Sequence, residues 1–105
     1  MRIACILENE FEDSELRIPV DGLVAAGHEV VLISREAGQE VKGKKKAEVV
    51  RADRGIDDVA PREFDALLIP GGKSPAKLKS DERFVTFVKR FAAEGKPIFA
   101  VCHGP

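Results

Sequence analysis

Residues 1–34, with the sequence MRIACILENEFEDSELRIPVDGLVAAGHEVVLIS, decide the fold class of this 105-residue chain. The stretch begins and ends with short apolar runs, at 1–7 and 28–34, whose lengths are typical of strands buried on both faces. Between them, apolar residues at spacings of three and four, followed by a glycine, predict a helix over 14–26, in which Pro19 is tolerated only near the first turn. A strand, a helix and a second strand in this order predict a βαβ unit and a parallel sheet.

The rest of the chain adds further elements of the same kind. Two glycines and the run Lys42–Lys46 interrupt 35–53, which favours a solvated hairpin whose lysines form a charged edge that resists aggregation. Ser80 is the expected N-cap of a second long helix. We expect a connection with a short helical turn over 56–64 and a third strand over 66–69. This helix is expected over 81–94 and a fourth strand over 97–101. The chain is therefore expected to be a single α/β domain over 1–105 with a mainly parallel sheet.

Composition excludes several classes of protein. Seventeen basic and eighteen acidic residues give a net charge of −1, and the chain has no Tyr or Trp, so no nucleic-acid or anionic-membrane surface is indicated. No apolar run approaches the roughly 20 residues of a membrane helix, and no metal-ligand spacing or Gly-rich phosphate loop occurs, so we expect a cytoplasmic protein without metal or cofactor. Cys5 and Cys102 are expected as reduced thiols, with Cys5 filling the core, and His28 is expected at the boundary of a strand.

Three segments are expected to converge where the strands of such a sheet end: the acidic loop 8–15, Pro70–Gly72 and Cys102–Gly104. Cys102 lies at a strand-to-helix turn with a glycine two positions later, which is typical of a nucleophile elbow, where a helix N-terminus favours the thiolate. The alternative is a cysteine that merely ends a buried strand. His103 either supplies a base or contributes its backbone amide, which together with the amide of Gly72 would form an oxyanion hole.

The acidic loop has more carboxylates than a turn requires, and the glycines after the third strand allow close approach of a substrate to the backbone. The carboxylates are Glu8, Glu10, Glu12, Asp13 and Glu15. We expect most of them in solvent, and one of them to reach Cys102, share a proton with it and move that proton during turnover.

Five ordered segments carry a resemblance to a known family. They are NEFEDSE at 9–15, PVD at 19–21, GHEV at 27–30, FDALLIPGG at 64–72 and AVCHGP at 100–105. Together they resemble the PfpI family of the ThiJ/PfpI superfamily, which contains intracellular cysteine proteases and protein deglycases. The resemblance implies a flavodoxin-like, doubly wound α/β sandwich and a homo-oligomer, either a dimer or a hexamer.

The resemblance also implies roles for individual residues. Cys102 is the nucleophile, His103 lies beside it, and the acidic partner falls on Glu15, with Glu12 as the alternative. The positions implied for the oxyanion and for substrate binding are Gly71, Gly72 and Gly104.

Two departures from the family pattern bear on function. Protease-type members have an acidic residue after the Pro-Gly-Gly loop, contributed across a subunit interface, and Ala76 stands at the matching position. Family members also continue beyond the Cys-His-Gly-Pro motif, at which this chain stops, so we expect a domain truncated after the elbow. The missing helix dipole and a nearby chain-end carboxylate would oppose ionisation of Cys102, and the isolated 105 residues are predicted to be inactive.

The leading functional hypothesis is a cysteine-dependent, cofactor-independent glyoxalase or deglycase that acts on methylglyoxal, glyoxal or their adducts with proteins and nucleotides. The missing acid favours it over the first alternative, an intracellular cysteine peptidase or amidase. A second alternative is a redox-sensing stress chaperone whose exposed cysteine is oxidised to the sulfinate. A class I glutamine amidotransferase fits less well, because the first-loop glutamates would have no role.

Overall fold

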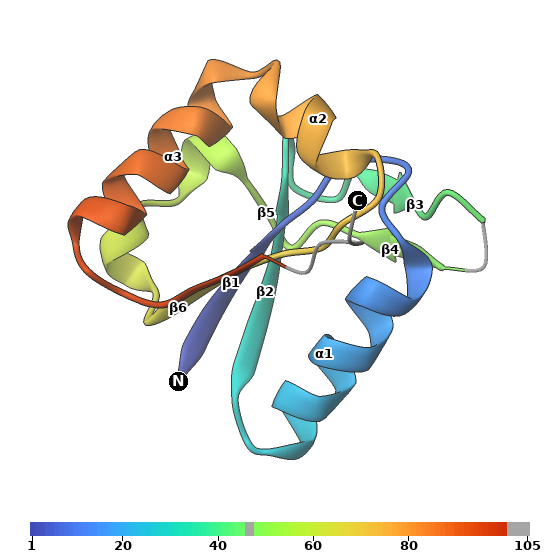
Figure 1. The fold of residues 1–105 in the computed structure, drawn as a ribbon, viewed down its shortest axis with the longest axis horizontal. Helices are drawn as coiled ribbons and strands as arrows, with labels where there is room; N and C mark the ends of the chain where they lie inside the picture. Colours follow the sequence, from blue (N-terminus) through green and yellow to red (C-terminus); the bar gives the residue numbers. More distant parts are fainter. Residues whose placement is uncertain (46–47, 101–105) are drawn as a thin grey trace.

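The computed structural model describes residues 1–45 and 48–100, in which five strands form a central sheet (Figure 1). The strands are β1 Arg2–Ile6, β2 Glu29–Ser34, β5 Arg54–Gly55, β6 Ala66–Ile69 and β7 Ile98–Ala100. Their order is β5-β2-β1-β6-β7, and every pairing between neighbours is parallel, which confirms the predicted sheet. Val101, the expected last residue of the fourth core strand, lies outside the described residues.

Helices cover both faces of the sheet, with α1 on one face and α2 and α3 on the other (Figure 1). Their bounds are α1 Asp13–Ala25, α2 Ser74–Lys79 and α3 Glu82–Ala93. The inner order β2-β1-β6-β7 places the first core strand between the second and the third, as in flavodoxin-like folds, and this confirms the doubly wound prediction. No helix in the described ranges is long and apolar enough to span a membrane.

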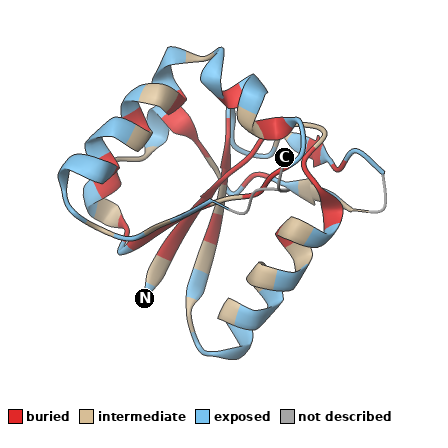
Figure 2. Ribbon diagram, viewed as in Figure 1, coloured by how far each residue is buried: buried red, intermediate tan, exposed pale blue. Residues whose placement is uncertain are grey.

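Alternate side chains of β1 enter two separate cores, because successive residues of a strand point to opposite faces. Ala4 and Ile6 pack with the phenylalanines of α3, whereas Ile3 and Cys5 pack with Leu16 of α1. Figure 2 shows the buried residues along the central strands and on the inward sides of the helices. A strand buried on both faces explains why residues 3–7 are all apolar.

Helix α1 begins one residue earlier than expected and passes through Pro19, which lies in its second turn and not near its first. A proline inside a helix removes one main-chain hydrogen bond. Packing of Leu16, Val20 and Leu23 on the sheet keeps the helix continuous despite that loss.

The region before α3 differs from the expectation in two ways: Ser80 is not the N-cap of α3, and the short helix α2 precedes it. The N-cap is Asp81, whose carboxylate accepts the Arg83 amide at 3.0 Å, while Ser80 donates to the Lys77 carbonyl at the end of α2. The hydrogen bond from the Arg83 side chain holds the pKa of Asp81 below its usual range. The sequence did not predict α2, because six residues with Leu78 as the buried apolar side chain are too few for a periodic pattern.

The predicted hairpin is present in the described part of 35–53. It consists of β3 Glu40–Lys42 and β4 Val49–Arg51, which pair antiparallel in a separate two-stranded sheet. Its inward-facing Val41 and Val50 pack on the core beneath α1, so this segment is anchored to the domain on one side.

The two minor expectations for single residues are confirmed. Cys5 is fully buried in the middle of β1, and this burial raises the pKa of its thiol from 9.0 to about 12. His28 directly precedes β2, and its Nδ1 atom lies 2.9 Å from the amino group of Met1.

Burial of the Cys5 thiol predicts a loss of stability at high pH. Because the folded-state pKa is raised, the unfolded chain ionises first, and the stabilisation present below about pH 9 declines as the pH rises toward 12. Between pH 8 and pH 10, urea unfolding of the full-length protein should show a fall in unfolding free energy on the order of 1 kcal/mol greater than that of Cys5→Ala. Parallel pH dependences of the two proteins would contradict this.

Candidate active site

The loops that follow β1 and β6 are joined into one unit at the carboxyl edge of the sheet. Phe11 forms an isolated antiparallel bridge with Gly72. The Glu12 amide donates to the Gly71 carbonyl at 2.9 Å, and the Lys73 amide donates to the Glu10 carbonyl at the same distance. Two of the three segments expected to converge therefore do so.

Gly72 has a backbone conformation and a packing that exclude a side chain. Its φ is +88°, and a Cβ atom built on it would lie 2.6 Å from the Glu12 nitrogen and 2.7 Å from the Glu10 carbonyl oxygen. The space beside its Cα is thus filled by the acidic loop, not left open to a substrate as the sequence suggested. Because the two hydrogen bonds flank the Phe11–Gly72 pair, the N–H of Gly72 points away from Phe11, where it can still act as a donor.

The carboxylates of the acidic loop are mostly buried, so the expectation that most of them lie in solvent is wrong. Glu8, Glu12 and Asp13 are each at most 7% exposed, and Glu10 and Glu15 are half-buried. Glu12 is the N-cap residue of α1, and Glu15 lies in the first helical turn, not in the loop. Acidic side chains are stabilised at this end of a helix by its dipole.

The described lysines of the run are exposed, as expected of a charged edge, but the run also contributes to this site. Lys44 Nζ lies 2.9 Å from Glu12 Oε2, and Lys45 Nζ lies 3.8 Å from Glu12 Oε1. The hydrogen bond to Glu12, followed by the charges of Glu12, Glu15 and Asp13, raises the pKa of Lys44. Lys44 therefore pairs with Glu12 and is also attracted by the charges of Glu15 and Asp13. Lys46 lies outside the described residues.

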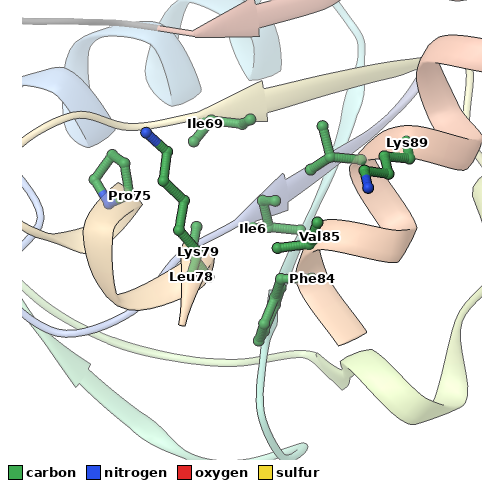
Figure 3. A pocket seen from close by; sticks show the side chains of 9 residues that line it. Ile6, Ile69, Pro75, Leu78, Lys79, Phe84, Val85 and Lys89 are labelled. Carbon is green, nitrogen blue, oxygen red and sulfur yellow. The ribbon is translucent and has the colours of Figure 1, made fainter. Parts of the chain in front are cut away.

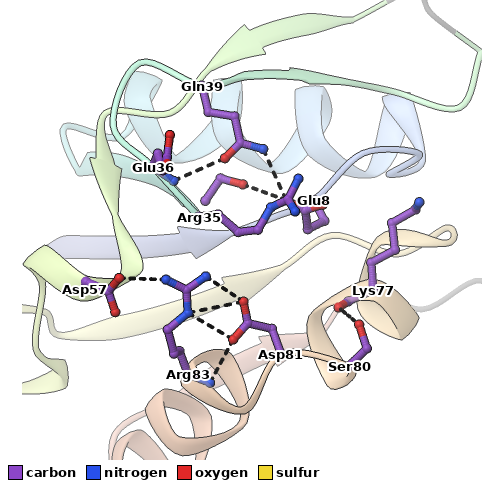
Figure 4. Close-up of polar contacts among 10 residues, drawn as sticks. Glu8, Arg35, Glu36, Gln39, Asp57, Lys77, Ser80, Asp81 and Arg83 are labelled. Carbon is purple, nitrogen blue, oxygen red and sulfur yellow. Dashed lines mark hydrogen bonds and ion pairs between the residues drawn. The ribbon is translucent and has the colours of Figure 1, made fainter.

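A second buried carboxylate, Glu8, holds the end of β1 in place (Figure 4). Its Oε1 atom accepts hydrogen bonds from Ser34 Oγ, Arg35 Nε and Gln39 Nε2 at 3.1, 3.1 and 3.3 Å. Its backbone amide donates to Ser74 Oγ at 2.8 Å. These contacts fix β1 to β2 and to the start of α2, and therefore fix the two loops relative to each other. In the sequence, only the position of Glu8 directly after an apolar run pointed to this role.

An apolar hollow of about 320 Å³ lies between α2 and α3 (Figure 3). It is lined by Ile6, Ile69, Pro75, Leu78, Phe84, Val85, Val88 and the side chains of Lys79 and Lys89. Among the described residues, Glu12, Glu15, Gly71 and Gly72 do not line it, so the hollow is separate from the cluster of carboxylates.

Cys102, His103 and Gly104 lie outside the described residues. Ala76 is exposed on α2, so the position at which protease-type members have an acid is open to solvent.

Comparison with known proteins identifies the family. The family model described as the DJ-1/PfpI family matches residues 1–105. The chain belongs to the DJ-1/PfpI family. This confirms the resemblance drawn from the five motifs of the sequence.

Curated bacterial proteins of similar sequence include two that match nearly the whole chain. Protein/nucleic acid deglycase 2 of Escherichia coli is 55% identical over 104 residues, and General stress protein 18 of Bacillus subtilis is 51% identical over 104 residues. Each match covers 99% of this chain and 60% of the relative. The chain therefore spans about 60% of the length of these curated relatives.

A solved structure of a DJ-1/PfpI protein supports the same fold. The two-domain protein of Anabaena variabilis, which contains DJ-1/ThiJ/PfpI-like and ferritin-like domains, superposes with a TM-score of 0.93 at 38% identity. The match covers 99% of this chain and 30% of that chain.

Proposed function

We propose that this DJ-1/PfpI chain carries the nucleophile and the proton partner of a cysteine-dependent glyoxalase or deglycase. Its substrates are methylglyoxal, glyoxal or their adducts with proteins or nucleotides, and it needs no cofactor. The observation that carries the proposal is the hydrogen bonding of the acidic-loop backbone, which bears the buried carboxylate of Glu12, to the Gly71–Gly72 loop at the carboxyl edge of the sheet. The neighbouring strand β7 ends at Ala100, which pairs with Ile69 and precedes Cys102 by two residues in the sequence.

In this proposal the Cys102 thiolate adds to the carbonyl carbon of the aldehyde, and the negative charge that develops on the oxygen is stabilised by the backbone amides of Gly72 and His103. Glu15 holds and moves the proton exchanged with the sulfur and the substrate, and His103 is the second candidate for this transfer. Gly104 permits the sharp turn of the elbow.

Two further observations favour this reaction over peptide hydrolysis. Ala76 supplies no carboxylate to a Cys-His-acid triad. The relative that is 55% identical is named as a protein/nucleic acid deglycase. A dimer or hexamer, expected from the resemblance, and a cytoplasmic location, expected from the composition, belong to the same proposal.

The test is turnover of methylglyoxal and of a glycated peptide by the full-length gene product. Cys102→Ser should abolish turnover, and Glu15→Gln should lower kcat/KM by about 10² to 10⁴, the usual contribution of a proton-transferring group. The matched control is Glu40→Gln, an exposed glutamate of β3 whose carboxylate lies 3.6 Å from Lys42 Nζ, which should leave turnover unchanged.

Other outcomes would favour the alternatives. Full activity of Glu15→Gln together with loss in Glu12→Gln would assign the proton to Glu12. A wild-type protein that turns over neither methylglyoxal nor the glycated peptide but cleaves peptides would indicate a peptidase. The same lack of turnover in a protein whose Cys102 is readily oxidised by peroxide would indicate a redox sensor.

A further inference from the structure

The tip of the β3–β4 hairpin is held against the start of α1 by hydrogen bonds that its backbone amides donate. Asp13 accepts hydrogen bonds from the amides of Lys45 and Glu48, at 3.0 and 2.8 Å, through its two carboxylate oxygens. The Lys44 amide donates to the Phe11 carbonyl at 2.9 Å. Gly43 lies so close that a Cβ there would collide with the Asp13 carboxylate.

A second contact holds the other side of the hairpin. Glu48 Oε1 accepts hydrogen bonds from both Arg17 Nη2, at 2.7 Å, and Arg17 Nε, at 3.1 Å. The backbone that carries Lys44 is therefore fixed on both sides of the turn, although the lysine side chain itself is partly exposed. A fixed backbone lowers the entropic cost of holding a long side chain against one partner.

This clamp delivers a positive charge to a carboxylate that has little contact with water. The Glu12 side chain is 5% exposed, and its two oxygens lie 2.9 and 3.8 Å from Lys44 Nζ and Lys45 Nζ. Within the described residues, Asp13 and Glu15 are further charged groups that attract Lys44. Ion pairs of this kind favour the charged form of a carboxyl group, whereas neighbouring carboxylates disfavour it.

We propose that Lys44 is a positioning residue of the site, which keeps Glu12 ionised so that Glu12 does not serve as the proton carrier. The inference deepens the proposed function and rests on it for its catalytic meaning. In this proposal the hairpin determines which of the two candidate glutamates, Glu12 or Glu15, transfers the proton. With Glu12 committed to an ion pair, proton transfer to and from the substrate is left to Glu15.

The test is a titration of the Glu12 carboxyl carbon by ¹³C NMR in the full-length protein, with the signal assigned by Glu12→Gln. Lys44→Met should raise the Glu12 midpoint by about 1 pH unit, because an opposite charge at this distance lowers a carboxyl pKa by about 1 to 3 units. Lys44→Arg should restore the wild-type midpoint. Lys42→Met is the matched control, since Lys42 lies in the same hairpin and pairs with Glu40.

A Glu12 midpoint that is the same in Lys44→Met and in wild type would overturn the inference. Lys44→Gln gives a second removal of the charge if the methionine variant does not fold. The acidic limb of kcat/KM should also move to higher pH, because removal of Lys44 takes away a positive charge that interacts with Glu15, the proposed proton carrier. An NMR shift in a protein that turns over no dicarbonyl would retain the ion-pair role and reject the proposed function, so the two failures are distinguishable.

Discussion

Gly72→Ala is expected to lower both the stability and the turnover of the full-length protein strongly. An alanine at φ +88° is strained, and its Cβ would lie 2.6 Å from the nitrogen of Glu12 and 2.7 Å from the carbonyl oxygen of Glu10. Both atoms belong to the backbone and cannot move away as a flexible side chain would. The acidic loop must therefore shift, and Glu12 and Glu15 shift with it. We expect an additional loss of about 1–3 kcal/mol beyond the strain of the left-handed conformation.

Gly27→Ala provides the matched control for this prediction. Gly27 has nearly the same φ, +90°, but nothing lies within 4 Å of the Cβ position. Its substitution should cost about 1–2 kcal/mol through backbone strain and leave turnover intact. Urea unfolding and kcat/KM would be measured for both variants. Equal losses of stability in the two proteins would show that the contact between Gly72 and the acidic loop contributes nothing.

The sequence predicted the sheet and the long helices because their signals are local. Continuous apolar runs mark β1 and β2, and apolar spacing marks α1 and α3, whatever the rest of the chain does. The convergence of the acidic loop with Gly71 and Gly72 also followed from the sheet, since the carboxyl ends of parallel strands share one edge. These predictions needed only the order of the elements.

At the candidate site, the failures of the sequence interpretation are non-local. The buried carboxylate of Glu12 pairs with Lys44, 32 positions away, and the buried carboxylate of Glu8 accepts hydrogen bonds from Ser34 and Arg35, 26 and 27 positions away. A run of lysines and a run of glutamates each indicate solvent when taken alone. The carboxylates of the acidic loop have their partners in distant segments, Glu10 in Lys77 of α2 and Glu12 in Lys44, and no periodic pattern reveals such pairings.

Removal of the Asp13 carboxylate is the second substitution from which we expect a large effect. In Asp13→Asn the side chain retains one acceptor for two amide donors, those of Lys45 and Glu48, and places an NH₂ group against the other. Hydrogen bonds to a charged group contribute about 1.5–3 kcal/mol each, so we expect a loss of about 2–3 kcal/mol. Amide hydrogen exchange at Lys45 and Glu48 should accelerate as the hairpin detaches.

Asp53→Asn is the control for Asp13→Asn, because it also removes a carboxylate that accepts a hydrogen bond from a backbone amide. Asp53 Oδ2 accepts the Leu32 amide at 2.8 Å, but the residue is exposed, so water replaces the lost acceptor. Its effect should be about 1 kcal/mol or less, with unchanged exchange at Lys45 and Glu48. Slow exchange at these two amides in Asp13→Asn would show that other contacts hold the hairpin.

The Asp13 substitution also tests whether the hairpin contacts are needed to hold the Lys44 charge close to Glu12. If the clamp holds Lys44 against Glu12, then Lys44→Met should raise the Glu12 midpoint by about 1 pH unit in the wild-type background and by clearly less in Asp13→Asn, where the lysine is no longer held. Comparison within each background removes the direct effect of the lost Asp13 charge on Glu12. The same cycle with Asp53→Asn should show no coupling. Equal shifts in the wild-type and Asp13→Asn backgrounds would mean that Lys44 reaches Glu12 without the hairpin clamp.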